Sequence, residues 1–122
     1  TRDWKAHVRE LSTSSTGLFR FGWLSPFLDP YAQLMVFHSE SLNNYTGWKS
    51  AEFDQLLEKI SGEEDVKKRQ QYLARADEIL VNKDIVVIPV FHYANSVLLS
   101  ERAKGIQINR LGFVDFLSID SE

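Results

Sequence analysis

Three aromatic side chains lie close together near the start of this chain, at Trp23, Phe27 and Tyr31. Large rings that carry an N–H or O–H group combine apolar contact with a hydrogen bond, and such residues line many ligand sites. One interpretation is therefore that Trp23, with Phe27 and Tyr31 nearby, forms one wall of a ligand-binding cleft. A second interpretation is open for Trp23, because a strand tryptophan also packs well inside a hydrophobic core.

The remaining reactive residue types form no recognisable catalytic or metal-binding pattern. The three histidines, His7, His38 and His92, are not spaced from one another or from carboxylates like zinc ligands, and the chain has no cysteine. No Gly-x-Ser-x-Gly, His-Glu-x-x-His or phosphate-loop motif is present. We therefore expect no enzyme, no metal and no cofactor.

Composition indicates a globular chain of ordinary polarity. The 122 residues are 43% hydrophobic and 25% charged, with a net charge of −3, and such a length fits one small unit. A slightly acidic chain lacks the basic face that nucleic acids require, so nucleic acid is not an expected partner. No apolar run approaches the roughly 20 residues of a membrane span.

The elements that position the aromatic residues can be read from periodicity. An amphipathic helix is expected over residues 2–12, and an apolar strand that contains Trp23 over residues 18–24, with Arg20 interrupting it. Asp29 and Pro30 are typical of a capped helix start, which predicts a short helix over residues 32–37.

Two longer helices and several strands should follow. Ser50 is expected to cap a helix that ends at Ser61, with Gly62 just beyond it, and a second helix is expected over residues 63–81. Apolar stretches predict strands at residues 85–93 and 96–100. Pro89 inside the first of these implies a sheet edge or a bulge. This order of elements indicates mixed α/β packing.

The ordered set of motifs resembles the C-terminal part of the oligopeptide and dipeptide substrate-binding proteins that serve ABC importers. The resemblance covers roughly the whole chain, and the set is more specific than any single motif in it. The matching segments are Gly22-Trp23, Asp29-Pro30, Asn43-Asn44, Tyr45 to Trp48, Phe53-Asp54, Ala76 to Leu80, and Ile88-Pro89-Val90-Phe91.

This resemblance implies a fold and a function. The fold would be the periplasmic-binding-protein-like II class, with residues 1–122 forming one fragment of the C-terminal lobe, a mixed sheet flanked by helices. The intact protein would be periplasmic or on the cell surface, with a lipid anchor as one option. It would bind a peptide or peptide-like ligand between this lobe and its N-terminal lobe, and would deliver the ligand to the ABC permease. The chain lacks an initiating Met, which we interpret as a piece cut from a longer protein.

The resemblance also assigns ligand contacts, with one departure. Trp23 maps onto the family's cleft tryptophan, and Phe27, Asp29 and Tyr31 are further candidates. The family's aspartate that pairs with the peptide amino group falls on Pro26 here. A buried ammonium without a carboxylate is costly, so either Asp29 takes that role or the ligand differs. Capping of the following helix is the simpler role for Asp29.

A different class of function is also open. The same fold serves in sensors, so the chain is alternatively a ligand-sensing or docking module of a regulatory protein. The two hypotheses predict different sequences upstream of Thr1: a lipoprotein signal and a second lobe for transport, or a signalling domain for regulation.

Overall fold

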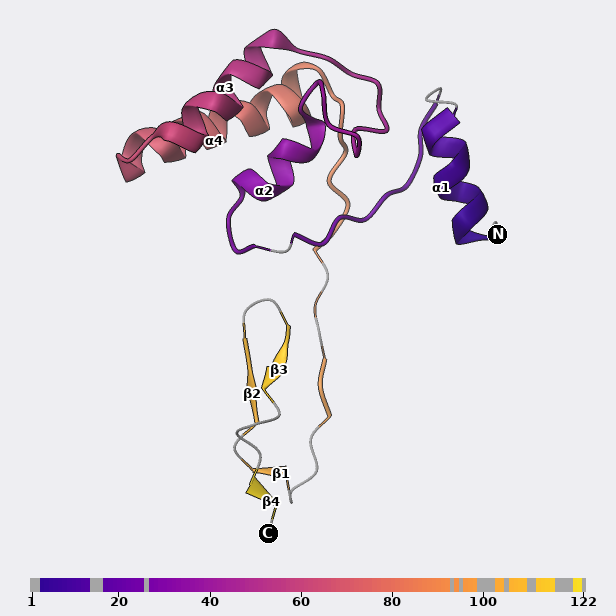
Figure 1. Ribbon diagram of the computed structural model, residues 1–122, viewed down its shortest axis with the longest axis vertical. Helices are drawn as coiled ribbons and strands as arrows, with labels where there is room; N and C mark the ends of the chain where they lie inside the picture. The colour runs from indigo at the N-terminus through magenta and orange to yellow at the C-terminus, as the bar shows by residue number, and fades with distance from the viewer. Residues whose placement is uncertain are drawn as a thin grey trace.

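The computed structural model describes residues 3–13, 17–25, 27–92, 94, 96–98, 103–104, 106–109, 112–115 and 120–121. Its helices are α1 (Trp4–Thr13), α2 (Tyr31–Leu34), the 3-10 turn η1 (Met35–Phe37), α3 (Ala51–Gly62), α4 (Val66–Glu78) and the π-helical turn η2 (Ile79–Lys83). Its strands are β1 (Ala103–Lys104), β2 (Gln107–Ile108), β3 (Val114–Asp115) and β4 (Asp120–Ser121). Figure 1 shows the helices gathered at one end and the strands at the other.

The hydrophobic core lies between α2, α3, α4 and η2. The face of α3 formed by Phe53, Leu56, Leu57 and Ile60 is buried, as the sequence predicts. It packs on the apolar side of the α4–η2 helix, which runs alongside it (Figure 1). Burial of this apolar surface is the main stabilising contribution to the helical part. The members of the core are Leu34, Phe53, Leu56, Leu57, Ile60, Ala76, Ile79 and Leu80.

Side-chain caps fix where the two long helices begin. The Ser50 hydroxyl accepts a hydrogen bond from the Phe53 N–H, which confirms the predicted cap of α3. Asp65 caps α4 by accepting from the N–H groups of Lys67 and Lys68. The predicted start of the second helix at residue 63 was therefore wrong, because a cap residue is itself outside the helix. Gly62 is the last residue of α3 rather than the residue after it.

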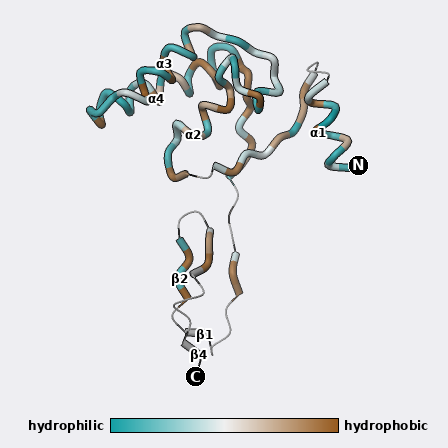
Figure 2. The backbone as a smooth tube through the Cα atoms, in the orientation of Figure 1, coloured by the Kyte–Doolittle hydropathy of each residue, from teal (hydrophilic) through white to brown (hydrophobic). Residues whose placement is uncertain are grey.

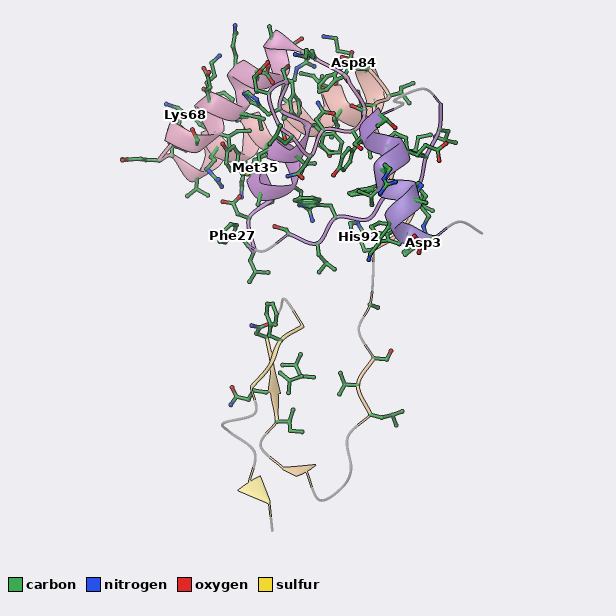
Figure 3. All side chains as sticks on the ribbon, turned by 45° about the vertical axis from the view of Figure 1, so that its right-hand side comes forward. Asp3, Phe27, Met35, Lys68, Asp84 and His92 are labelled. Carbon is green, nitrogen blue, oxygen red and sulfur yellow. The ribbon has the colours of Figure 1, made fainter. Side chains whose placement is uncertain are left out.

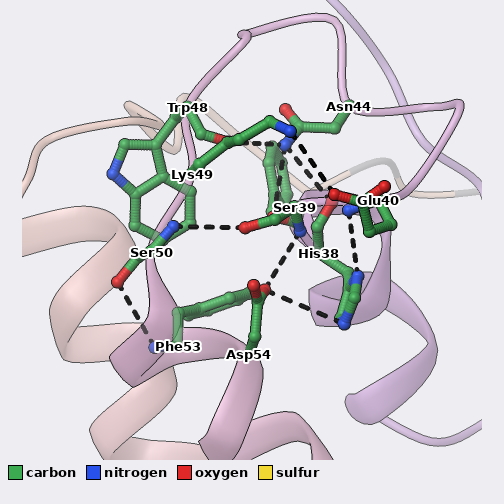
Figure 4. A network of polar contacts seen from close by, with 10 residues as sticks. His38, Ser39, Glu40, Asn44, Trp48, Lys49, Ser50, Phe53 and Asp54 are labelled. Carbon is green, nitrogen blue, oxygen red and sulfur yellow. Dashed lines mark hydrogen bonds and ion pairs between the residues drawn. The ribbon is translucent and has the colours of Figure 1, made fainter.

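The polar loop between η1 and α3 is held by its own side chains (Figure 4). The Asn44 amide donates to the carbonyl oxygens of Phe37, His38 and Trp48, at 3.3, 3.4 and 2.9 Å. Its carbonyl oxygen accepts from the N–H and hydroxyl of Thr46. Asn44 thus organises the loop rather than facing a ligand, as is common for Asn in turns.

The strands predicted over residues 18–24, 85–93 and 96–100 are not formed by the described residues, and residues 93, 99 and 100 of these predictions lie outside the described residues. The described residues of these segments follow extended paths and are assigned to no strand (Figure 1). The physical reason is that a strand is defined by its pairing, and an apolar run can be strand-like without a neighbour to pair with. The described sheets are two antiparallel two-stranded pairs, β1–β4 and β2–β3. A mixed sheet is not present in the described part of the chain.

The β2–β3 hairpin turns through Gly112, whose φ of 82° suits glycine. The Phe113 N–H donates to the side-chain oxygen of Asn109, and the Asn109 N–H donates to the Phe113 carbonyl. Among the described residues, no helix is long and apolar enough to cross a bilayer.

Candidate functional site

A concavity lies between α1 and the segment of residues 18–24. It is an open hollow of about 710 Å³, a size within the range of small-ligand sites. Its walls combine aromatic rings, one imidazole and one guanidinium. The lining residues are Trp4, His7, Arg20, Phe21, Gly22, Trp23 and Leu24.

Two contacts hold α1 against the other wall of this hollow. The His7 ring nitrogen Nε2 lies 3.0 Å from the main-chain carbonyl oxygen of Arg20, so this nitrogen carries the proton and donates. The Trp4 ring stacks on Phe21 with 6.1 Å between ring centroids. Phe21 in turn meets Tyr45 edge-on at 5.4 Å, which ties the hollow to the loop before α3.

Trp23, the first candidate from the sequence, lines this hollow. Its side chain is 41% exposed and is not part of the hydrophobic core. The alternative interpretation of a core tryptophan is therefore not what the structure shows. Exposed aromatic surface beside a concavity is available to stack on a ligand.

The other three sequence candidates do not line the hollow. Phe27 is 66% exposed on the turn before α2, and Figure 3 shows it well away from Asp3 at the start of α1. Tyr31 packs against the helical core. Pro26, which occupies the position of the family's amine-pairing aspartate, lies outside the described residues.

Asp29 is engaged in two contacts within the chain. One carboxylate oxygen accepts from the Tyr31 N–H at 3.0 Å, and the other accepts from the Arg69 guanidinium at 2.8 Å. The hydrogen bond from Arg69 is the main cause of the lowered pKa of the Asp29 carboxyl, and burial opposes it. This geometry fits the capping role that the sequence favours. Arg69 also donates through Nε to the carbonyl of Ile60 at the end of α3.

Trp4, His7 and Arg20 were not among the ligand contacts predicted from the sequence. The sequence did contain a signal that Arg20 is functional, because a charged residue inside an otherwise apolar run is costly to bury without a partner. The guanidinium lies 5.8 Å from the centroid of the Phe91 ring, in cation–π range. It brings positive charge beside the aromatic wall.

The described residues show no group of three side chains placed to hold a metal ion. His38 lies 3.9 Å from Asp54 at the loop before α3 (Figure 4), but Asp54 also accepts from the Ser39 N–H. Such a pair organises a loop. What the hollow offers is binding surface: two indole rings, one cation and hydrogen-bond donors.

Comparison with known proteins gives a consistent result, although no family model matches the chain. A putative binding protein of Haemophilus influenzae is 36% identical over 110 residues, covering 87% of this chain and 21% of that protein. The oligopeptide-binding protein OppA of Bacillus subtilis is 31% identical over 115 residues, covering 93% of this chain and 21% of that protein. These relatives are binding proteins by name.

The fold is also found in a solved structure. The substrate-binding domain of an oligopeptide ABC transporter from Bacillus anthracis matches 98% of this chain with a TM-score of 0.80 and 23% sequence identity, over 24% of the solved chain. The fold expected from the sequence is confirmed to this extent, as part of a periplasmic-binding-protein-like domain. The chain spans about a fifth of the length of the relatives it matches. This chain is thus similar in sequence to a stretch of proteins that are named oligopeptide- and dipeptide-binding proteins.

Proposed function

We propose that this chain is part of the C-terminal lobe of an extracytoplasmic substrate-binding protein that binds peptides for an ABC importer, without catalysis. The homology to peptide-binding proteins supports this proposal. The observation that carries it at the level of residues is the position of Trp23, half exposed at the wall of an open hollow.

The chemistry of the hollow suits a peptide. The indoles of Trp4 and Trp23 offer apolar faces to side chains, and the Arg20 guanidinium suits a carboxylate or a carbonyl oxygen. Roomy apolar walls with few charges favour broad specificity over the selection of one sequence. Trp23 is the ligand contact best supported by the geometry. Phe27, Asp29 and Tyr31 remain weaker candidates.

The mechanism that we propose is closure of two lobes around the ligand, of which this chain supplies part of one. The closed, loaded protein would then dock on the permease subunits of the importer. A cleft formed between lobes has only one wall in this chain, so we expect the 122-residue piece alone to bind peptide weakly or not at all. A mixed sheet completed outside this chain, a periplasmic or surface location and a possible lipid anchor belong to the same proposal.

The test uses the longer protein and compares two aromatic truncations. Trp23→Ala should weaken binding of a mixed oligopeptide library about tenfold or more in calorimetry, equal to about 1.4 kcal/mol. Phe113→Ala, which removes a ring that is 67% exposed in the β2–β3 hairpin and outside the hollow, should leave the affinity within about twofold. Equal affinities of wild type and Trp23→Ala, or no peptide binding by the wild type, would contradict the proposal. Native mass spectrometry of the protein from its own cells would identify its ligand.

A further inference from the structure

The described walls of the hollow carry a positive charge and no carboxylate. Among the lining residues, Arg20 brings one guanidinium, while Trp4 and Trp23 bring indole N–H groups, which can only donate. Phe21 and Leu24 are apolar, and Figure 2 shows hydrophobic colour on parts of the chain that leads from α1 to α2. These side chains suit an apolar group or a hydrogen-bond acceptor, and they offer no negative charge to a cation.

His7 supplies no negative charge either. Its Nε2 donates to the main-chain carbonyl of Arg20 at 3.0 Å, so one ring nitrogen is already used to hold α1 in place. The other nitrogen, Nδ1, accepts one hydrogen bond when the ring is neutral, and it becomes a second donor when the ring is protonated. To a ligand ammonium group, this imidazole is therefore either a single neutral acceptor or a second cation.

Two carboxylates on or beside α1 are close to these walls in sequence, but they do not line the hollow. Neither Asp3 nor Glu10 is among the described lining residues. The Asp3 carboxylate accepts a hydrogen bond from the Ala6 N–H at 3.3 Å, at the start of the helix. Helix α1 thus contributes Trp4 and His7 to the hollow, three positions apart on one face, and no acidic side chain.

Asp29, the carboxylate that follows the other wall, is engaged within the chain. Its oxygens accept from the Tyr31 N–H at 3.0 Å and from the Arg69 guanidinium at 2.8 Å. The hydrogen bond from Arg69 lowers the pKa of the Asp29 carboxyl, as expected for a carboxylate that is already paired. To serve as the counter-charge of a ligand ammonium, Asp29 would have to give up Arg69 and its place at the start of α2.

This charge distribution bears on the ligand, because an ordinary peptide carries an ammonium group at its N-terminus. An ammonium that leaves water needs a carboxylate partner, and without one the loss of hydration is not compensated. A guanidinium in the same hollow adds like-charge repulsion, which grows as the site is shielded from water. Both effects act against a free ammonium, and neither acts against a neutral or blocked terminus.

We propose that the hollow takes a part of a peptide-like ligand that bears no ammonium group, so that binding does not require a free α-amino group. The inference rests on the proposed function, because it assigns the ligand chemistry of the same site. Peptides with a blocked or missing amino group, and cyclic peptides, belong to this class of ligand.

Paired peptides test the role of the amino group. A lysine-free oligopeptide library is titrated into the longer protein in calorimetry, once with free and once with acetylated N-termini. The tightest-binding sequence is also made in a des-amino form, which removes the charge without adding volume. Loss of the amino group should leave the Kd within about threefold or lower it. A Kd raised more than about threefold for the des-amino peptide would overturn the proposal, because the amine would then be an anchor.

Reversal of the charge in the hollow tests where the ligand end lies. Arg20→Glu places a carboxylate there, so the free-amine peptide should bind at least about tenfold more tightly than its des-amino form. Arg9→Glu, at an exposed position of α1 outside the hollow, makes the same change in net charge and should keep the wild-type ratio within about threefold.

Thermal melting followed by circular dichroism checks that both variants are folded. If Arg20→Glu does not fold, Arg20→Gln, which removes only the positive charge, should shift the ratio in the same direction by about threefold. An unchanged ratio in a folded Arg20 variant would overturn the inference, because the ligand end would then lie elsewhere.

The same titrations separate this inference from the proposed function. If neither form of the library binds to the longer protein, the proposed function is refuted and the inference fails with it. If peptides bind only with a free amine, the proposed function stands and the inference is wrong. Loss of that amine preference in Asp29→Asn would then identify Asp29 as the anchor.

Discussion

The guanidinium of Arg69 donates a hydrogen bond of 2.8 Å to the carboxylate of Asp29, 40 residues earlier in the chain. This ion pair joins the turn before α2 to the first turns of α4. Because the second Asp29 oxygen caps α2 through the Tyr31 N–H, one side chain serves both the local and the long-range structure. A ligand amine at this carboxylate would share it with two existing partners.

Substitution of Asp29 should separate its two roles. Asp29→Ala removes both the cap and the ion pair, and we expect it to lower the free energy of unfolding by about 1.5 kcal/mol. Asp29→Asn keeps a side chain that caps well but removes the charge, so the loss should be about 0.5 kcal/mol. Urea unfolding followed by far-UV circular dichroism measures both values.

Asp77→Asn is the control for this pair, since Asp77 is exposed on α4, and it should change the free energy of unfolding by less than about 0.5 kcal/mol. Equal stabilities of Asp29→Ala and Asp29→Asn would show that the cap contributes nothing.

The same carboxylate should make stability depend on pH in the acid range. The Arg69 hydrogen bond holds the pKa of Asp29 below its ordinary value of 3.8. A group with a lowered folded-state pKa stabilises the fold above its unfolded-state pKa, and this contribution is lost as the pH falls through the folded-state value. We therefore expect the stability difference between wild type and Asp29→Asn to be constant from about pH 5 to 8 and to shrink below about pH 4. A difference that grows on acidification would contradict this assignment.

Phe53 is the core residue whose substitution should lower the free energy of unfolding most. It is fully buried, and the Trp48 ring meets it edge-on at 5.1 Å. Phe53→Ala should lower the free energy of unfolding by about 3–5 kcal/mol, because it leaves a cavity between α3 and α4. The control is Phe27→Ala, at an exposed ring, which should stay within about 0.5 kcal/mol. A loss below about 1 kcal/mol for Phe53→Ala would mean that the core repacks around the cavity.

Local sequence signals predicted the helical part well. Ser50 predicted the start of α3, and the apolar residues that recur every three or four positions after it predicted the buried face of this helix. Such signals act over one or two turns, so they need no knowledge of the rest of the fold. The start of α4 was placed too early because Glu63, Glu64 and Asp65 are all acidic, and only the hydrogen bonds show that Asp65 is the cap.

Long-range relationships could not be read in the same way. Nothing near Asp29 indicates that its partner is Arg69, and nothing near Trp23 indicates that α1 forms the facing wall of the hollow. The apolar runs at residues 18–24 and 85–93 predicted strands that the described residues do not form, because strand pairing depends on chain segments that are distant in sequence. For the same reason, sequence reasoning found Trp23 but not Arg20.

The backbone of Ile85 is in a strained conformation. A substitution that relieves this strain should stabilise the chain. Ile85 is the one described residue other than glycine with a positive φ, at 50°, and it lies just beyond Asp84, the residue that follows η2. A β-branched side chain in this region costs roughly 1–2 kcal/mol, whereas asparagine tolerates it. Because the Ile85 side chain is 64% exposed, its replacement loses little burial. Ile85→Asn should therefore raise the free energy of unfolding by about 1 kcal/mol.

Ile88→Asn is the matched control in the 122-residue chain, because Ile88 is similarly exposed, at 61%, and is not among the residues with positive φ. It should give no gain in urea unfolding. Ile85→Pro should act in the opposite direction, since proline fixes φ near −65° and cannot adopt the observed angle. If Ile85→Asn destabilised the chain as much as Ile85→Pro does, the left-handed turn after η2 would not be the conformation in solution. The direction in which residues 86–91 leave the core would then also need to be revised, because that turn sets it.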